Sequence, residues 1–105
     1  MKNFTAIENN TATSQFLAWG DMETTVNAIK FVNPTATISN RFPSHIKVTV
    51  NERPECKGQF ITARYYEDSD IQVAIEAIKF ANPYTVIVVK DNRLYVTCIP
   101  YWFGL

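Results

Sequence analysis

Glycine, histidine and cysteine are all scarce in this chain of 105 residues, and the scarcity of each argues against a class of site. The three glycines, Gly20, Gly58 and Gly104, stand apart, so the sequence has no glycine-rich loop that could cradle a phosphate. The one histidine, His45, cannot form a multi-histidine metal site, and no serine or cysteine motif accompanies it as in a catalytic triad. The sequence therefore predicts a protein that is not an enzyme, with no metal and no cofactor.

The two cysteines, Cys56 and Cys98, lie far apart and have no CxxC spacing. This spacing argues against both a redox motif and a disulfide scaffold. Cys98 falls in an apolar, strand-like run, which is typical of a small buried hydrophobic residue. Cys56, in "NERPECKG", is expected to be a partly exposed free thiol in a loop.

Neither an excess charge nor a long hydrophobic run is present. Ten Lys and Arg residues balance ten Asp and Glu residues, so the net charge gives no long-range attraction to nucleic acid or to an anionic membrane. The start of the chain, "MKNFTAIENNTATSQ", lacks the apolar segment of a signal peptide, and no run reaches the roughly 20 apolar residues that span a bilayer. We expect a cytoplasmic protein, with no membrane contact, that forms a single domain over residues 1–105.

An internal repeat is the most informative feature that is present. The chain reads "AIKFVNP" from Ala28 and "AIKFANP" from Ala77, and the match extends without a gap when Asp21 is aligned with Asp70. The simplest explanation is an internal duplication of a unit of roughly 50 residues. We place the first copy at about residues 14–50, the second at about 58–99 and an aromatic tail at 100–105.

Each copy is predicted to form a strand, a helix and two further strands. Pro34 and Pro83 disfavour helical backbone in the residue before them, so both helices should end there. Ser69 has the spacing of an N-cap residue with Gln72, and Asp70 suits the positive end of the helix dipole. The firmest strands are 84–89 and 94–99, on either side of a turn signal. A further hairpin, with its loop near residues 57–58, should link the two copies.

The apolar arc of each predicted helix covers more than half of its circumference, which is wider than packing on one sheet requires. We therefore expect the two helices to lie side by side and to touch, with Phe31 and Phe80 at the edge of the arc. The predicted fold class is α+β: internally duplicated βαββ units form an antiparallel sheet with two helices packed on one face.

The other face of that sheet is the candidate functional surface. If Val86, Val88 and Leu94 point toward the helices, strict alternation turns Ile87 and Tyr95 to the opposite, apolar side. Such a face is evidence that something covers it, and the aromatic tail "PYWFGL" continues the pattern. The predicted interface residues are Ile87, Tyr95, Ile99, Tyr101, Trp102 and Phe103.

Three explanations of this face remain open. The first is a protein interface, with either a protein partner or a second copy in a homodimer, because Tyr and Trp are enriched among binding hot spots. The second is that the chain's own termini cover it. The third is binding of single-stranded nucleic acid, in which tyrosines (Tyr65, Tyr66, Tyr95 and Tyr101) stack on bases and basic residues contact phosphates. This third explanation is weakened by the zero net charge, and its principal residues would be Arg64, Tyr66, Lys90 and Arg93.

Two resemblances are of a general kind. The paired βαββ units resemble the duplicated modules of vicinal-oxygen-chelate proteins, whose His and Glu metal ligands have no equivalent in this sequence. In its small size, balanced charge and richness in Asn and Thr, the chain is similar to small phage-encoded inhibitors of host machinery, without a shared motif. We therefore predict a non-enzymatic protein that binds and covers a surface of a protein partner, as an inhibitor or adaptor does.

Overall fold

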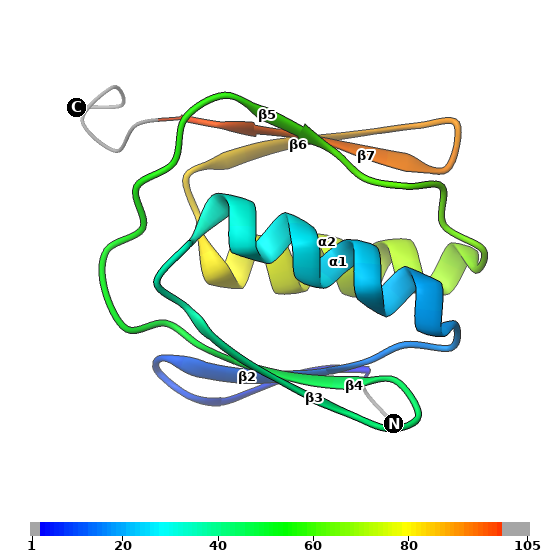
Figure 1. The fold of residues 1–105 in the computed structure, drawn as a ribbon, viewed down its shortest axis with the longest axis horizontal. Helices are drawn as coiled ribbons and strands as arrows, with labels where there is room; N and C mark the ends of the chain where they lie inside the picture. Colours follow the sequence, from blue (N-terminus) through cyan, green and yellow to red (C-terminus); the bar gives the residue numbers. More distant parts are fainter. Residues whose placement is uncertain (1–2, 100–105) are drawn as a thin grey trace.

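The computed structural model describes residues 3–99, which fold into three layers (Figure 1). Two helices form the middle layer. A four-stranded sheet with the order β1-β2-β4-β3 covers one side of the helices, and a three-stranded sheet with the order β5-β7-β6 covers the other. We call these the large sheet and the small sheet. All paired strands are antiparallel, so the predicted α+β class with antiparallel strands is confirmed.

The helices and strands follow one another in a regular order along the chain. Their bounds are β1 (Phe4–Glu8), β2 (Thr11–Gln15), α1 (Trp19–Val32), β3 (Thr37–Arg41), β4 (His45–Thr49), β5 (Gln59–Ile61), α2 (Asp68–Ala81), β6 (Thr85–Lys90) and β7 (Arg93–Cys98).

Two units of the chain share one topology. In the first unit, β2, α1, β3 and β4 place the last strand between the other two, and β5, α2, β6 and β7 do the same in the second. The two helices lie side by side and run in the same direction, so that their N-terminal ends meet at one end of the molecule (Figure 1). The strand order is thus repeated, while the origin of the two units by duplication stays a prediction.

The prediction of a single sheet is wrong, because the strands divide into two sheets. The hairpin predicted to link the copies does not form: β4 lies in the large sheet and β5 in the small sheet, and residues 50–58 cross between them. Figure 1 shows this segment passing the C-terminal ends of both helices. The two sheets also explain the wide apolar arc of each helix, because both sides of the helix layer are covered.

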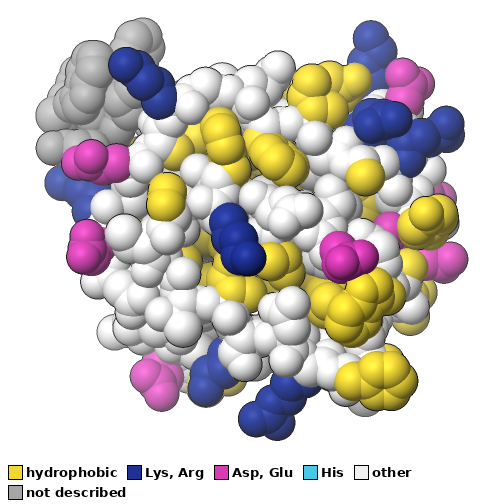
Figure 2. All heavy atoms as spheres, in the orientation of Figure 1, with side chains coloured by type: hydrophobic (Ala, Val, Ile, Leu, Met, Phe, Trp, Pro, Cys, Tyr) yellow, Lys and Arg dark blue, Asp and Glu magenta, His cyan; other side chains and the backbone are white. Residues whose placement is uncertain are grey.

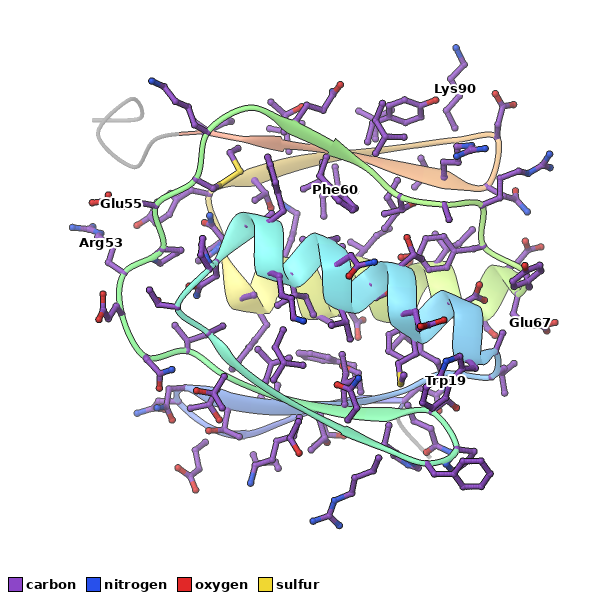
Figure 3. All side chains as sticks on the ribbon, in the orientation of Figure 1. Trp19, Arg53, Glu55, Phe60, Glu67 and Lys90 are labelled. Atoms are coloured by element: carbon purple, nitrogen blue, oxygen red, sulfur yellow. A yellow bond between two sulfur atoms is a disulfide. The ribbon has the colours of Figure 1, made fainter. Side chains whose placement is uncertain are left out.

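The core lies between the three layers. Ile29 and Ile78, at equivalent positions of the two helices, are fully buried. Phe31 packs on Phe60 of the small sheet, with ring centroids 5.6 Å apart, and Figure 3 shows Phe60 pointing from β5 toward the helices. At the equivalent position, Phe80 packs on Phe4 of the large sheet at 6.0 Å. Each phenylalanine therefore joins its helix to an edge strand.

The helix ends agree only partly with the sequence pattern. Both helices stop before Asn-Pro as predicted, and the N–H groups of Asn33 and Asn82 donate to the carbonyls of Ile29 and Ile78. Ser69 is not the N-cap: α2 begins at Asp68, and no side-chain hydrogen bond caps it from the preceding residue. Among residues 3–99, neither helix has the length and apolar character needed to cross a membrane.

Candidate functional site

Two aspartates, one at the N-terminal end of each helix, accept hydrogen bonds from the backbone of the opposite unit. The Asp21 carboxylate, in the first turn of α1, accepts hydrogen bonds from the backbone N–H groups of Tyr66 at 2.8 Å and Glu67 at 3.1 Å, just before α2. The Asp70 carboxylate, in the first turn of α2, accepts from Leu17 at 2.9 Å and Ala18 at 3.1 Å, just before α1. Each aspartate thus satisfies backbone donors that the other helix leaves unpaired.

Both of these carboxyl groups are completely buried, and they lie within hydrogen-bonding reach of each other. Burial raises the pKa of Asp21 to about 6. The neighbouring Asp70 adds to the increase, and the bonds from Tyr66 and Glu67 oppose it. Because no solute can reach a pair with no exposed area, we assign the two carboxyls a structural role.

The same end of the molecule contains a close approach between the two units. A Cβ atom on Gly20 would lie 2.8 Å from Cε2 of Tyr66, so the tyrosine ring could not keep its place beside any larger residue. Trp19, beside it, lies at the exposed end of α1 (Figure 3). Glycine at position 20 therefore allows the Tyr66 ring to cover the start of α1.

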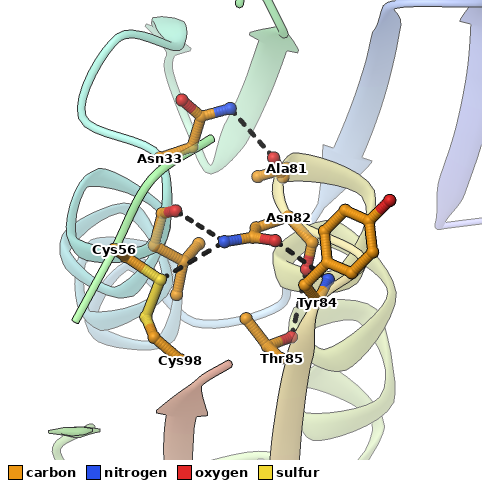
Figure 4. The surroundings of a disulfide bond; sticks show 8 residues. Asn33, Cys56, Ala81, Asn82, Tyr84, Thr85 and Cys98 are labelled. Atoms are coloured by element: carbon orange, nitrogen blue, oxygen red, sulfur yellow. Dashed lines mark hydrogen bonds between the residues drawn. A yellow bond between two sulfur atoms is a disulfide. The ribbon is translucent and has the colours of Figure 1, made fainter. Parts of the chain in front are cut away.

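The prediction that Cys56 is a free thiol and Cys98 a simple buried residue is wrong, because the two form a disulfide (Figure 4). Their Cα atoms are 5.7 Å apart, although 42 residues separate them in the chain. The bond joins the 50–58 crossover to the end of β7. The Asn82 Nδ2 donates to the Cys56 sulfur at 3.3 Å and to the Val32 carbonyl at 2.9 Å. Sequence spacing could not reveal this pairing, since the fold alone brings the two residues together.

The direction of the side chains differs between the two strands of the β6–β7 hairpin. On β7 the prediction is correct: Leu94 and Val96 are buried against the helices. On β6 it is wrong, because the turn contains only Asp91 and Asn92, and both have positive φ as in a type I′ turn. This register places Ile87 opposite Val96, on the helix side of the sheet.

The residues on the outer face of the small sheet form two rows across the strands. In the first row Ile61, Tyr95 and Val88 are neighbours, and in the second row Gln59, Thr97 and Val86 are neighbours. Ile61 is 49% exposed and Val88 is 54% exposed, although both are apolar. We call the surface formed by these six side chains the outer face of the small sheet.

The predicted interface residues are thus separated. Tyr95 lies on the outer face, whereas Ile87 faces the helices and is partly buried. Ile99 follows β7, where its N–H donates to the Tyr84 carbonyl at 2.9 Å. The tail residues Tyr101, Trp102 and Phe103 lie outside the described residues. Val86, Val88 and Ile61 are exposed residues of this face that the sequence analysis missed. The direction of the two valines depends on the turn register, and that of Ile61 on the pairing of β5 with β7.

The basic residues of the nucleic-acid hypothesis gather at one corner. Arg93 donates to the Thr62 carbonyl at 3.2 Å and lies opposite Lys90, and Tyr65 N–H donates to the Asn92 carbonyl, which brings Arg64 to the same turn. Figure 2 shows dark blue side chains at this corner, where Figure 3 labels Lys90.

One of the tyrosines of that hypothesis, Tyr65, is not available for stacking. The Tyr65 hydroxyl is buried and bonded to the Thr25 hydroxyl at 2.8 Å, so its ring cannot stack on a base. Tyr66, whose ring lies beside Gly20, is 76% exposed, so its role in the nucleic-acid hypothesis stays a prediction.

The described residues contain no group of three or more His, Cys, Asp or Glu side chains that could hold a metal ion. Comparisons of the chain with protein-family models, with curated proteins and with solved structures found no match.

Proposed function

We propose that this chain is a non-enzymatic protein-binding protein, and that β6 is the strand through which it binds. The observation that supports this proposal most is the open edge of the small sheet. An exposed, apolar edge strand is a template on which another chain can add a strand.

The four edges of the two sheets differ in how well they are protected. On the large sheet, β1 is interrupted by a bulge between Ala6 and Glu8, and β3 is mostly polar. On the small sheet, β5 has only three residues. By contrast, β6 reads "TVIVVK" and has six residues in continuous register, with one charged side chain at its end. Bulges, polar side chains and shortness are recognised ways of blocking an edge, and β6 has none of them along most of its length.

The backbone groups that β6 offers follow from the turn. The two-residue turn makes Lys90 and Arg93 a hydrogen-bonded pair, so Val88 and Val86 also bond to β7. The N–H and C=O groups of Ile87 and Val89 then point away from the sheet. The Thr85 carbonyl points the same way, and the Lys79 ammonium donates to it at 2.7 Å. Within residues 3–99, two residues of β6 thus present a complete set of open donors and acceptors.

The occupant that we propose is β6 of a second copy. In antiparallel pairing about a twofold axis, Ile87 of one copy opposes Val89 of the other, and four hydrogen bonds satisfy both residues of both chains. This register leaves the Lys79 bond to Thr85 intact. It also places Val88 opposite its own equivalent on the outer face, so that two apolar faces become one. Such a doubled face could cover a surface of another protein, which is how an inhibitor or adaptor acts.

Val88→Lys tests this proposal, and Ile61→Lys is its matched control. Both residues lie in the same row of the outer face and are about equally exposed, but only Val88 lies on β6. We expect sedimentation velocity to show a dimer for the wild type and for Ile61→Lys, and a monomer for Val88→Lys, because two lysines would face each other. A monomeric wild type at several hundred micromolar, or equal effects of the two lysines, would contradict the proposal.

Cross-linking tests the register independently. A Val88→Cys chain should form an intermolecular disulfide under mild oxidation, because cysteines in a non-hydrogen-bonded pair lie close enough to bond. Val86→Cys, on the same strand and the same face, should not, because this register places it opposite Lys90 of the other copy. Efficient cross-linking of both variants would reject the register but not the dimer.

A further inference from the structure

The outer face of the large sheet contains a hollow of about 730 Å³. It runs along β4, where His45, Lys47 and Thr49 lie in a line, and the flanking strands supply hydroxyl groups on both sides of this line. Lys47 has Thr13 and Ser39 as its cross-strand neighbours. We call this hollow the basic hollow.

The charges in the basic hollow all have one sign. Arg41 and Lys47 line it with His45, and Arg41 lies directly opposite His45 in the pairing of β3 with β4. Among residues 3–99, no carboxylate lines the hollow, and neither Arg41 nor Lys47 forms an ion pair. Glu8, opposite Thr11 at the β1 edge, is the nearest acidic residue in the register of this face. Unpaired cations among hydroxyl donors are complementary to an anionic ligand.

An aromatic side chain stands at the rim of the hollow. Phe42, in the turn between β3 and β4, is 90% exposed and is one of the lining residues. Ile7, which is also exposed, lies on the β1 side. A free phenylalanine ring beside a basic, hydroxyl-lined surface offers a stacking platform next to phosphate contacts, and this combination is typical of proteins that bind single strands.

We propose that the basic hollow binds single-stranded nucleic acid. Arg41 and Lys47 hold successive backbone phosphates, the Thr37 and Ser39 hydroxyls donate further hydrogen bonds to them, and a base stacks on Phe42. This site lies on the opposite sheet from β6, and it is independent of the proposed protein-binding function. It also differs from the predicted nucleic-acid site at Arg64, Tyr66, Lys90 and Arg93. Because the hollow has few cations, we expect weak binding, in roughly the 1–100 µM range typical of non-specific complexes.

Fluorescence anisotropy with labelled 12-nucleotide oligo(dT) and oligo(U), at 50–200 mM KCl, tests the proposal. For the double variant Arg41→Gln/Lys47→Gln we expect at least a tenfold loss of affinity. The slope of log K against log salt should also flatten by about 1.4, since each phosphate contact on a single strand contributes about 0.7. Phe42→Ala should weaken binding about tenfold while the salt slope is unchanged, because stacking releases no counterions.

Three controls make the result specific. Lys30→Gln removes an exposed lysine from α1 and should leave binding unchanged. Glu8→Gln removes the nearby negative charge and should tighten binding slightly. Val88→Lys alters only the opposite sheet, so we expect the dimer to be lost while oligonucleotide binding persists, which separates this proposal from the previous one.

Two outcomes would overturn the proposal. One is wild-type protein that binds neither oligonucleotide at 50 mM KCl, and the other is binding that the Arg41/Lys47 double variant retains. Binding of heparin without binding of oligonucleotides would assign the hollow to a sulfated polysaccharide and would equally reject it. Thermal melts of each variant show whether a loss of binding reflects a loss of fold.

Discussion

At the scale of single residues, the buried carboxyl pair shows how one side chain can serve two helices. A lone ionised carboxylate in the interior would be destabilising unless donors satisfy it. Asp21 has two backbone donors from the opposite unit, yet burial and the neighbouring Asp70 still raise its pKa from 3.8 to about 6. The arrangement therefore connects the two units but leaves the protein sensitive to pH.

The pH dependence of stability follows from the sign of this shift. Because the folded pKa of Asp21 is above its unfolded value, the folded state binds the proton more tightly, and stability falls as pH rises from about 4 to about 6. A shift from 3.8 to about 6 corresponds to a loss of roughly 3 kcal/mol. Asp21→Asn should abolish this fall, although it removes one of the two backbone hydrogen bonds at every pH, because the amide has a single acceptor oxygen. Urea unfolding at a series of pH values measures the difference.

Glu23→Gln is the control for that experiment, because Glu23 is an exposed carboxylate on the same helix. It should leave the pH profile parallel to that of the wild type between pH 4 and pH 6. If Asp21→Asn also follows the wild-type profile in parallel, the carboxyl pair does not carry the pH dependence.

The sequence contained part of this information. The gapless alignment places Asp21 on Asp70 and Asn33 on Asn82, so these pairs were visible as equivalent positions. Their role was not visible, because local pattern suggested only helix-start chemistry for Asp70. Asp70 accepts hydrogen bonds from Leu17 and Ala18, more than 50 residues away, and local sequence patterns do not predict contacts over such a separation.

At the scale of helices and strands, the predictions succeed where the signal is local. The residue before a proline avoids helical backbone, and both helices end there as predicted. The β6–β7 hairpin lies within one residue of its predicted bounds. The failures concern pairing: an apolar strand pattern does not state which sheet the strand joins, so β5 was paired with the wrong neighbour. The basic hollow was missed for the same reason, because its residues come from four strands.

The C-terminal ends of the helices exchange hydrogen bonds through two buried asparagines. The Asn33 Nδ2 donates to the Ala81 carbonyl and the Asn82 Nδ2 to the Val32 carbonyl, each at 2.9 Å. Asn82 also contacts the Cys56 sulfur, and its Oδ1 accepts from the Tyr84 N–H at 2.9 Å. Asn82 thus supports the crossover, the helix pair and the start of β6 together.

A matched pair of variants tests the importance of this network. Asn82→Ala should lower the free energy of unfolding by about 2–3 kcal/mol, because it leaves several buried groups unpaired. Asn33→Ala should lower the free energy of unfolding by about 1–2 kcal/mol, since the side-chain oxygen of Asn33 accepts only from the Thr35 hydroxyl among the described residues. Chemical denaturation measures both values. Equal costs, or a larger cost for Asn33→Ala, would show that the additional bonds of Asn82 contribute little.

At the scale of the whole molecule, the disulfide closes the second unit onto the crossover. Residues 50–58 have no strand or helix of their own, and they link the two sheets past the helix ends. A covalent link is expected to stabilise the fold here, since a cross-link restricts the unfolded chain over the whole loop between the two cysteines. Here the loop spans 42 residues. The sequence alone argued against this bond, because the spacing of the cysteines does not indicate that the end of β7 lies beside the crossover.

Reduction of this bond should therefore lower stability without changing the order of the layers. From its loop length we expect a loss of about 2–4 kcal/mol in the free energy of unfolding. Urea unfolding with and without dithiothreitol measures this loss. The double variant Cys56→Ala/Cys98→Ala should have the same free energy of unfolding as the reduced protein, and dithiothreitol should not change it. If dithiothreitol leaves the stability of the wild type unchanged while mass spectrometry shows two free thiols, the disulfide does not stabilise the fold.

The disulfide and Asn82 should also act together, because Asn82 contacts Cys56. In the reduced protein, Asn82→Ala should lower the free energy of unfolding by less than it does in the oxidised protein, so the two effects should be less than additive.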